Sequence, residues 1–226
     1  IKNLKNYINN EKKIVIFRKV INKDILKNII KNRNSILKRK PLFTKTFLGS
    51  KDQFTFNKKD KRSYVKGYYR KIELYPWNEK NEKIFLNLSK VMNLKCWMDN
   101  MQFKGLKKKK FFDTKKFIKL HLMNYPPKKG FLKKHIDGVY KTIMVVQFGM
   151  SSSLKKTKNG GLIFYFGKEK VSIDHYVKQG DVFVYNSIIP HAVKPLKSKK
   201  ERWSTLISAG YFQGSKGTKP QSHQVN

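Results

Sequence analysis

The residues best suited to chemistry in this sequence are two histidines and one aspartate. His135 and Asp137 are two residues apart, and His191 follows later in the chain. Side chains alternate along an extended strand, so His135 and Asp137 point to the same side and can hold one ion. A second histidine from a later antiparallel strand completes a face of two histidines and one carboxylate. Such a face leaves three positions open on an octahedral metal and favours non-haem Fe(II) oxygen chemistry, whereas a structural zinc site closes four positions.

A second pair with strand spacing, Arg202 and Ser204, follows His191. A guanidinium can bind a carboxylate through two parallel hydrogen bonds, and a neighbouring hydroxyl suits the same anion. We therefore expect a dicarboxylate that chelates the metal at one end and is held by Arg202 and Ser204 at the other.

The stretch from Phe117 to Tyr211 resembles the Fe(II)/2-oxoglutarate-dependent dioxygenases. The resemblance implies a mainly β protein with flanking helices, in which a double-stranded β-helix (jelly-roll) core is buttressed by N-terminal helices. It also implies Fe(II), 2-oxoglutarate as cosubstrate and O₂, with ascorbate as an optional addition. The matching motifs are Asn124-Tyr125-Pro126-Pro127, His135-x-Asp137, Gly160-Gly161-Leu162, Gly180-Asp181, His191-x-Val193-x-Pro195 and Arg202-x-Ser204.

The resemblance assigns a role to six of these residues. It implies that His135, Asp137 and His191 are the catalytic Fe(II) ligands. It implies that the cosubstrate-binding residues are Tyr125, Arg202 and Ser204.

The subfamily is not decided by these motifs. The tyrosine before Pro-Pro and the Arg-x-Ser pair resemble plant flavonoid oxygenases and isopenicillin N synthase, whereas His-x-Val-x-Pro resembles prolyl hydroxylases. Met123 stands where the plant-like branch usually has asparagine, which affects the substrate class more than the reaction. Halogenating members of the family lack the carboxylate that Asp137 supplies here, so the resemblance favours hydroxylation.

Three residues before Tyr125 are candidates for the substrate pocket. Lys119, His121 and Met123 alternate with Tyr125 along one predicted strand and share its face. His121 is interpreted equally well as a buried histidine with a satisfied hydrogen bond.

The charge of the chain is strongly positive. Lysine and arginine number 52 against 14 acidic residues, a formal net charge of +38, and the densest basic run is Lys107–Lys110. Such a charge favours polyanionic partners, among them nucleic acid. Tyr64, Tyr68 and Tyr69 are aromatic residues that could stack on bases.

The chain length and the 39% of hydrophobic residues favour one domain with a packed core. We expect a single oxygenase domain over 1–226, with a helical N-terminal support over 1–110, the jelly-roll over 111–213 and a flexible tail over 214–226. The single cysteine excludes an internal disulfide, and no apolar run is long enough for a signal peptide or a membrane span. We therefore expect a cytoplasmic protein.

Sequence periodicity predicts the main elements. A strand at 14–17 precedes an amphipathic helix that begins after Asn22 and continues through Leu37, and a second helix covers 78–92. The predicted later strands are 117–125, 142–148, 161–166, 182–185 and 203–208.

The expected activity is hydroxylation of an unactivated C–H bond in a small molecule or amino acid, with release of succinate and CO₂. One alternative is an oxygenase that acts on nucleic acid or a protein side chain, although Ser208 stands where base-repair members of the family have a second arginine. A second alternative is a basic nucleic-acid-binding protein with a vestigial metal site. A third resembles isopenicillin N synthase and uses no 2-oxoglutarate.

Overall fold

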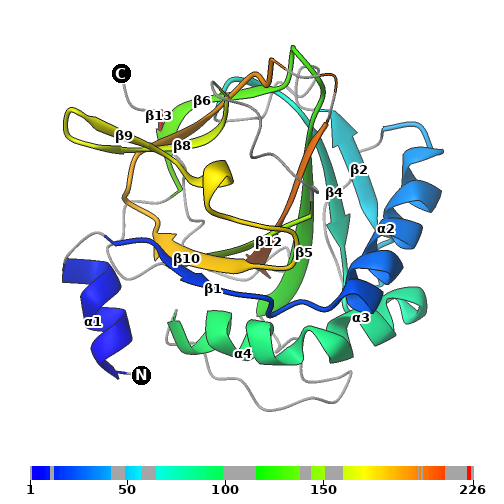
Figure 1. The fold of residues 1–226 in the computed structure, drawn as a ribbon. Helices are drawn as coiled ribbons and strands as arrows, with labels where there is room; N and C mark the ends of the chain where they lie inside the picture. Colours follow the sequence, from blue (N-terminus) through cyan, green and yellow to red (C-terminus); the bar gives the residue numbers. More distant parts are fainter. Residues whose placement is uncertain are drawn as a thin grey trace.

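Two antiparallel β-sheets face each other, and helices run along the outside of the larger sheet (Figure 1). This arrangement confirms the predicted mainly β jelly-roll with flanking helices. The lysine-rich run Lys107–Lys110 and Tyr64 lie outside the described residues. The computed structural model describes residues 2–10, 13–41, 49–56, 65–98, 116–137, 144–150, 160–197, 199, 201–211 and 223–224.

The larger sheet has the strand order β1-β10-β7-β12-β5-β4-β2. Five of the strands expected from the sequence contribute to it, but β2 and β4 fall in a region to which periodicity assigned no element. The strands are β1 (Val15–Phe17), β2 (Gln53–Phe56), β4 (Arg70–Leu74), β5 (Lys116–Tyr125), β7 (Met144–Gly149), β10 (Val182–Asn186) and β12 (Arg202–Tyr211).

The smaller sheet has the order β13-β6-β11-β8-β9, and β3 also pairs with β6. One of its two edge strands, β13, belongs to the segment 214–226 that the sequence analysis expects to be flexible. This pair of residues is held against the sheet by β6, and the rest of that segment lies outside the described residues. The strands are β3 (Gly67–Tyr68), β6 (Phe131–Ile136), β8 (Gly161–Phe166), β9 (Glu169–Ser172), β11 (His191–Lys194) and β13 (His223–Gln224).

Helix α2 begins where the sequence predicts. The side chain of Asn22 accepts a hydrogen bond from the backbone N–H of Ile25 at 2.9 Å, which caps the helix. The second predicted helix is divided at Leu88, where the backbone leaves helical geometry. The helices are α1 (Lys2–Asn10), α2 (Lys23–Leu37), α3 (Glu82–Asn87) and α4 (Ser89–Met98), with 3-10 turns η2 (Glu79–Asn81) and η4 (Ile173–His175).

The two faces of the larger sheet have different partners. Its outer face packs against the helices through aliphatic residues such as Ile72, Leu120 and Ile207. Its inner face packs toward the smaller sheet through a second cluster that contains Tyr125 and Tyr185. Strand alternation therefore divides β5 into helix-facing residues and residues that line the space between the sheets.

Tyr69 belongs to this inner cluster, where its ring centroid lies 5.6 Å from that of Tyr125. A buried ring cannot stack on an external base. This position corrects the possibility that Tyr69 forms part of a nucleic-acid platform.

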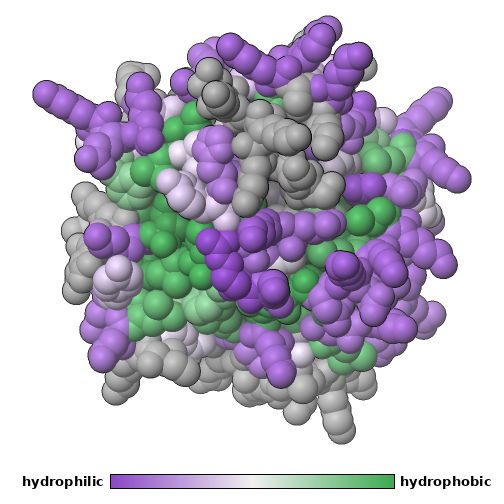
Figure 2. Space-filling model, in the orientation of Figure 1, coloured by the Kyte–Doolittle hydropathy of each residue, from purple (hydrophilic) through white to green (hydrophobic). Residues whose placement is uncertain are grey.

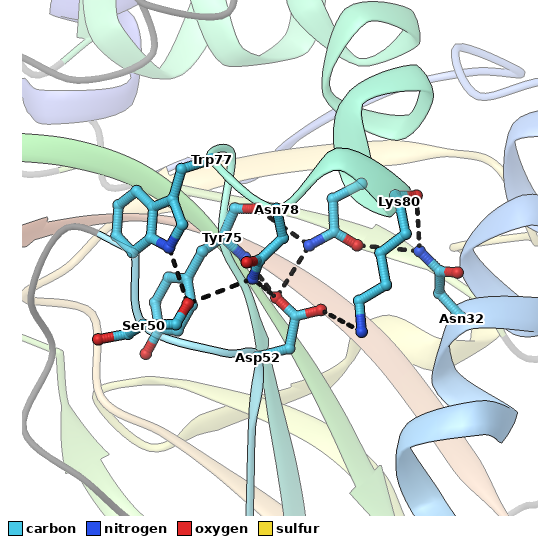
Figure 3. A network of polar contacts seen from close by, with 8 residues as sticks. Asn32, Ser50, Asp52, Tyr75, Trp77, Asn78 and Lys80 are labelled. Atoms are coloured by element: carbon cyan, nitrogen blue, oxygen red, sulfur yellow. Dashed lines mark hydrogen bonds and ion pairs between the residues drawn. The ribbon is translucent and has the colours of Figure 1, made fainter.

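A buried carboxylate ties β2, β4 and the helices together (Figure 3). Asp52 Oδ1 accepts hydrogen bonds from the backbone N–H of Tyr75 at 3.0 Å and from the side-chain amides of Asn78 at 2.6 Å and Asn81 at 2.9 Å. The amide of Asn32 on α2 donates to Asn81 Oδ1 at 2.9 Å. The network therefore fixes the end of β4 relative to α2 and η2.

Hydrophilic side chains project around the face shown in Figure 2, with hydrophobic surface between them. None of the described helices is both apolar and long enough to cross a bilayer.

Candidate metal and cosubstrate site

His135, Asp137 and His191 converge between the two sheets. His135 lies near the end of β6, Asp137 follows that strand, and His191 begins β11, directly opposite His135 in the strand pairing. His135 Nε2 is 3.5 Å from Asp137 Oδ1, and His191 Nε2 is 3.4 Å from Asp137 Oδ2. One ligand atom from each residue lies within 4.8 Å of the other two. The three residues predicted from spacing are therefore brought together.

Backbone carbonyls orient both imidazoles. His135 Nδ1 is 2.8 Å from the carbonyl oxygen of Lys133, and His191 Nδ1 is 2.9 Å from that of Ile189. A proton on each Nδ1 is donated to these oxygens, which leaves the Nε2 lone pairs directed toward Asp137. Two neutral imidazoles and one carboxylate with accessible lone pairs fit a divalent transition metal.

Asp137 is held by a relay from the larger sheet. The hydroxyl of Tyr185 on β10 donates to Asp137 Oδ2 at 3.1 Å, and the amide of Gln147 on β7 donates to the Tyr185 oxygen at 2.9 Å. The sequence analysis did not identify this relay, because neither residue has distinctive spacing from the triad.

The local charges keep the carboxylate ionised. Burial would raise the pKa of Asp137, but the neighbouring His191 and His135 outweigh burial and hold it well below its usual range. Burial lowers the pKa of His191 to about 4. Burial also acts to lower the pKa of His135, but the contact with Asp137 raises it above its ordinary value.

Arg202, Ser204 and Tyr125 form a second polar group at the neighbouring ends of β12 and β5. Arg202 is paired with Tyr125 in the sheet, and its guanidinium carbon lies 5.5 Å from the centre of the tyrosine ring. Arg202 Nη1 donates to Ser204 Oγ at 3.1 Å. All three residues are buried. The structure therefore groups the three residues that the resemblance implies for cosubstrate binding.

Asp174 is a partner of Arg202 that the sequence analysis did not identify. Its carboxylate accepts hydrogen bonds from Arg202 Nε at 2.7 Å and from Arg202 Nη2 at 3.0 Å. This pair occupies one edge of the guanidinium. The edge formed by Nη1 and Nη2 retains the geometry to bind a second carboxylate with two hydrogen bonds.

Gly161 allows this carboxylate to approach. Gly161 has a φ of +80°, and a Cβ atom there would lie 2.0 Å from Asp174 Oδ2. The same oxygen accepts a hydrogen bond from the backbone N–H of Leu162 at 2.9 Å. The Gly160-Gly161-Leu162 motif therefore helps to position Asp174, which in turn binds Arg202. The contact between the motif and Asp174 is visible in the folded structure and not in the spacing of these residues along the chain.

The candidate substrate residues lie on the inner face of β5. Met123 packs against the inner cluster that contains Tyr125. Lys119 and His121 contact Glu73 of β4, at 3.1 Å from Nζ and 3.0 Å from Nε2 respectively. The sequence analysis missed Glu73 because no strand was assigned to its region.

An apolar cavity of about 470 Å³ lies between β1 and the β8–β9 hairpin. Ile14, Ile16 and Phe166 line it and also pack against the inner cluster. Tyr176, which is 56% exposed, lies at the same cavity. The cavity therefore lies between the edge strands β1 and β9, and apolar side chains form most of its lining.

Sequence comparisons identify no relatives: no protein-family model matches the chain, and no curated protein matches it significantly. Solved structures do match. A prolyl-4-hydroxylase from Pseudomonas putida has a TM-score of 0.55 and 14% identity, with 92% of this chain and 98% of that chain covered.

Two further structures extend the likeness. A Trichoplax adhaerens prolyl hydroxylase, in complex with a peptide fragment of hypoxia inducible factor, has a TM-score of 0.52 and 16% identity and covers 93% of this chain and 90% of its own. The non-heme alpha ketoglutarate dependent epimerase SnoN from nogalamycin biosynthesis has a TM-score of 0.56 and 9% identity, with 98% and 94% covered. The chain therefore has the fold of the 2-oxoglutarate-dependent oxygenases.

Proposed function

We propose that this protein is an Fe(II)- and 2-oxoglutarate-dependent oxygenase that hydroxylates a C–H bond of a small molecule or amino acid. The observation that carries the proposal is the pairing of His135, Asp137 and His191 with a buried guanidinium, Arg202, on the facing sheet of an oxygenase fold. In the overall reaction the substrate C–H bond becomes C–OH, while 2-oxoglutarate and O₂ are converted to succinate and CO₂.

The triad residues hold iron from one side. The two Nε2 atoms and the Asp137 carboxylate would supply three ligands, which leaves room at an octahedral ion for the cosubstrate and O₂. Bound iron supplies oxygen activation coupled to the oxidative decarboxylation of 2-oxoglutarate. Asp137 supplies the carboxylate that halogenating members of the resembled family lack, and this supports hydroxylation over halogenation.

Arg202 and its neighbours orient the cosubstrate. The Nη1–Nη2 edge of the Arg202 guanidinium, where Nη1 also donates to Ser204, would bind the distal carboxylate beside the ring of Tyr125. Asp174 holds the guanidinium plane in place through its other edge. The keto acid end of 2-oxoglutarate would then be directed toward His135, Asp137 and His191.

The test is succinate release from 2-oxoglutarate by the Fe(II)-loaded protein under air. We expect His135→Ala to abolish release. We expect Arg202→Lys to raise the KM for 2-oxoglutarate about tenfold, because lysine cannot bind Asp174 and a second carboxylate with the same planar geometry.

Lys90→Gln is the control, because Lys90 is exposed on α4. Equal succinate release by the wild type and His135→Ala would refute the proposal. Iron-dependent oxidation of a substrate without consumption of 2-oxoglutarate would instead support the isopenicillin N synthase-like alternative. A peptide and RNA belong in the substrate panel, although none of the three structural neighbours above is described as acting on nucleic acid.

A further inference from the structure

A basic pocket lies at the edge of the larger sheet that β2 forms. We call it the Arg39 pocket; its volume is about 370 Å³, and its lining residues are Arg39, Lys51, Asp52, Asn78 and Lys80. The network of Figure 3 forms part of the lining, because Asp52, Asn78 and Lys80 belong to both. Three cations from separate segments, just after α2, just before β2 and within η2, therefore surround one hollow.

The backbone beside Lys51 is held in place by two side chains. The carbonyl oxygen of Ser50 accepts a hydrogen bond from Trp77 Nε1 at 2.8 Å and another from Asn78 Nδ2 at 3.3 Å (Figure 3). Ser50 is buried, whereas Lys51 is exposed. The lysine side chain therefore leaves a fixed point of the backbone toward solvent.

The other two cations also start from fixed positions. The carbonyl oxygen of Lys80 accepts a hydrogen bond from Asn32 Nδ2 at 3.1 Å, and the backbone N–H of Arg39 donates to the carbonyl oxygen of Ile36 at 3.0 Å. Asn32 and Ile36 lie on α2, which thus anchors both residues. Fixed starting points lower the entropic cost of gathering the three side chains around a ligand.

Asp52 is the one acidic side chain among the described residues that line the pocket, and it is fully buried. Its Oδ1 accepts the three hydrogen bonds described above, and its Oδ2 lies 3.3 Å from Lys80 Nζ. That ion pair needs one of the three N–H donors of the ammonium, and the Lys80 side chain remains 43% exposed. Asp52 therefore positions Lys80 and offsets one positive charge, which leaves the lining with a formal charge of +2.

Arg39 differs from the other arginines that the structure describes. Each of those has a side-chain partner: Arg18 has Asp181, Arg33 has Asn34, Arg70 has Glu201 and Arg202 has Asp174. Within the described residues, neither the Arg39 guanidinium nor the Lys51 ammonium has a hydrogen bond or an ion pair. A guanidinium can bind a phosphate through two parallel hydrogen bonds. The donors best suited to a phosphate therefore line the pocket unused.

The charge of the lining matches a phosphate dianion. A phosphate monoester carries a charge of about −1.5 to −2 at pH 7 and offers three strong acceptor oxygens. It can therefore neutralise the lining and accept hydrogen bonds from a guanidinium and two ammonium groups together. A single carboxylate carries one negative charge and would leave part of the repulsion between the cations in place.

The Arg39 pocket is separate from the candidate cosubstrate site. Tyr75, whose backbone N–H donates to Asp52, follows Leu74, and Leu74 is paired with Leu120 of β5. Leu120 lies five positions before Tyr125. A strand rises about 3.3 Å per residue, so these two points are about 16 Å apart along the sheet.

We propose that the Arg39 pocket binds a phosphate group through Arg39, Lys51 and Lys80. The group is the free ion or part of a small phosphate monoester. This inference does not depend on the proposed function, because none of the three residues belongs to the candidate metal and cosubstrate site. It gives a specific role to part of the large positive charge of the chain.

The test is calorimetric titration of the full chain in phosphate-free buffer, with sodium chloride holding the ionic strength at about 0.15 M. The probes are inorganic phosphate and glycerol 3-phosphate, with glycerol as the uncharged comparison. We expect saturable binding of at least one phosphate probe and none of glycerol. Arg39→Gln should weaken binding about tenfold, and Arg39→Lys should weaken it less because it keeps the charge but loses the planar pair of donors.

A matched control separates the pocket from the general positive field. Arg39→Gln/Lys51→Gln and Lys90→Gln/Lys168→Gln remove the same charge, but Lys90 and Lys168 are exposed residues outside the pocket. We expect the first pair to abolish binding and the second to change affinity less than about twofold, because salt screens distant charges. Arg202→Lys should also retain phosphate binding, since Arg202 belongs to the separate cosubstrate site.

Three results would overturn the inference. The first is that neither phosphate probe binds wild-type protein saturably. The second is that Arg39→Gln keeps wild-type affinity with an unchanged thermal transition. The third is that the control pair weakens binding as much as the pocket pair. Tighter binding of one probe than the other would identify the ligand as the ester or as the free ion. Succinate release, measured separately, decides the proposed function.

Discussion

Tyr185 connects the Asp137 carboxylate of the candidate metal site to the larger sheet. Its hydroxyl donates to Asp137 Oδ2 and accepts from Gln147. Its own pKa is raised well above the ordinary value by burial and by the nearby Asp137 carboxylate, so it remains a proton donor. Partners of this kind orient a ligand and set its basicity.

We expect Tyr185→Phe to weaken Fe(II) binding about tenfold, because Asp137 loses the donor that fixes its carboxylate. Competition with a metal chelator measures this affinity. Tyr165→Phe is a matched control that removes a tyrosine hydroxyl away from the metal site. On β8, Phe164 packs against His191, so the adjacent Tyr165 points to the other face of the sheet, where it contacts Lys134. Equal affinities in the two variants would show that the hydrogen bond does not tune the ligand.

The candidate metal site could be predicted from sequence because alternation along a strand places His135 and Asp137 on one side, and the structure brings His191 to them. Their supporting residues could not. Asp174 contacts Arg202 from a 3-10 turn, and Tyr185 reaches Asp137 from the opposite sheet. Such contacts depend on how the sheets pack, which the spacing of residues along the chain does not encode.

The same distinction holds for whole elements. Helix α2 and strands β5, β8, β10 and β12 have clear periodicity, and the structure confirms them. The strands β2 and β4 are short, and β4 alternates charged with aliphatic residues, so its inward-facing Lys71 and Glu73 resemble a solvent-exposed face. The tertiary partners Lys119 and His121 explain why this polar face is buried.

At the scale of elements, Asp52 joins β2 to the turn after β4 and to η2 (Figure 3). We expect Asp52→Ala to lower the free energy of unfolding by about 3 kcal/mol, because several buried donors lose their acceptor. Urea denaturation measures the change. Asp24→Ala is the control, because Asp24 is exposed and pairs with Lys27 at 3.6 Å, and we expect a loss below about 1 kcal/mol.

A loss from Asp52→Ala as small as that from Asp24→Ala would contradict the assigned role of the network. Loss of Asp52 would also affect the space between the sheets, because Tyr75 links the two regions. Its backbone N–H donates to Asp52, and its hydroxyl donates to Glu73. The network thereby contributes to the position of Glu73.

At the scale of the whole molecule, five of the ten acidic residues in the described part of the chain are buried or belong to the metal site. Of the 14 acidic residues, Asp52, Glu73, Asp174 and Asp181 are buried with specific partners, and Asp137 belongs to the metal site. Their negative charge is used internally, so the surface is left with an even larger excess of lysine. Such an excess destabilises the compact state through self-repulsion.

This repulsion predicts the salt dependence of stability. The Debye length falls from about 30 Å at 0.01 M to about 8 Å at 0.15 M ionic strength, so repulsion between distant surface lysines is screened while the buried pairs of Glu73 and Asp174 are affected little. We therefore expect the free energy of unfolding to rise over this range of sodium chloride. Urea is the suitable denaturant because it is uncharged, and potassium chloride should produce the same rise because screening depends on ionic strength. A fall in stability would mean that exposed ion pairs outweigh the repulsion of the net charge of +38.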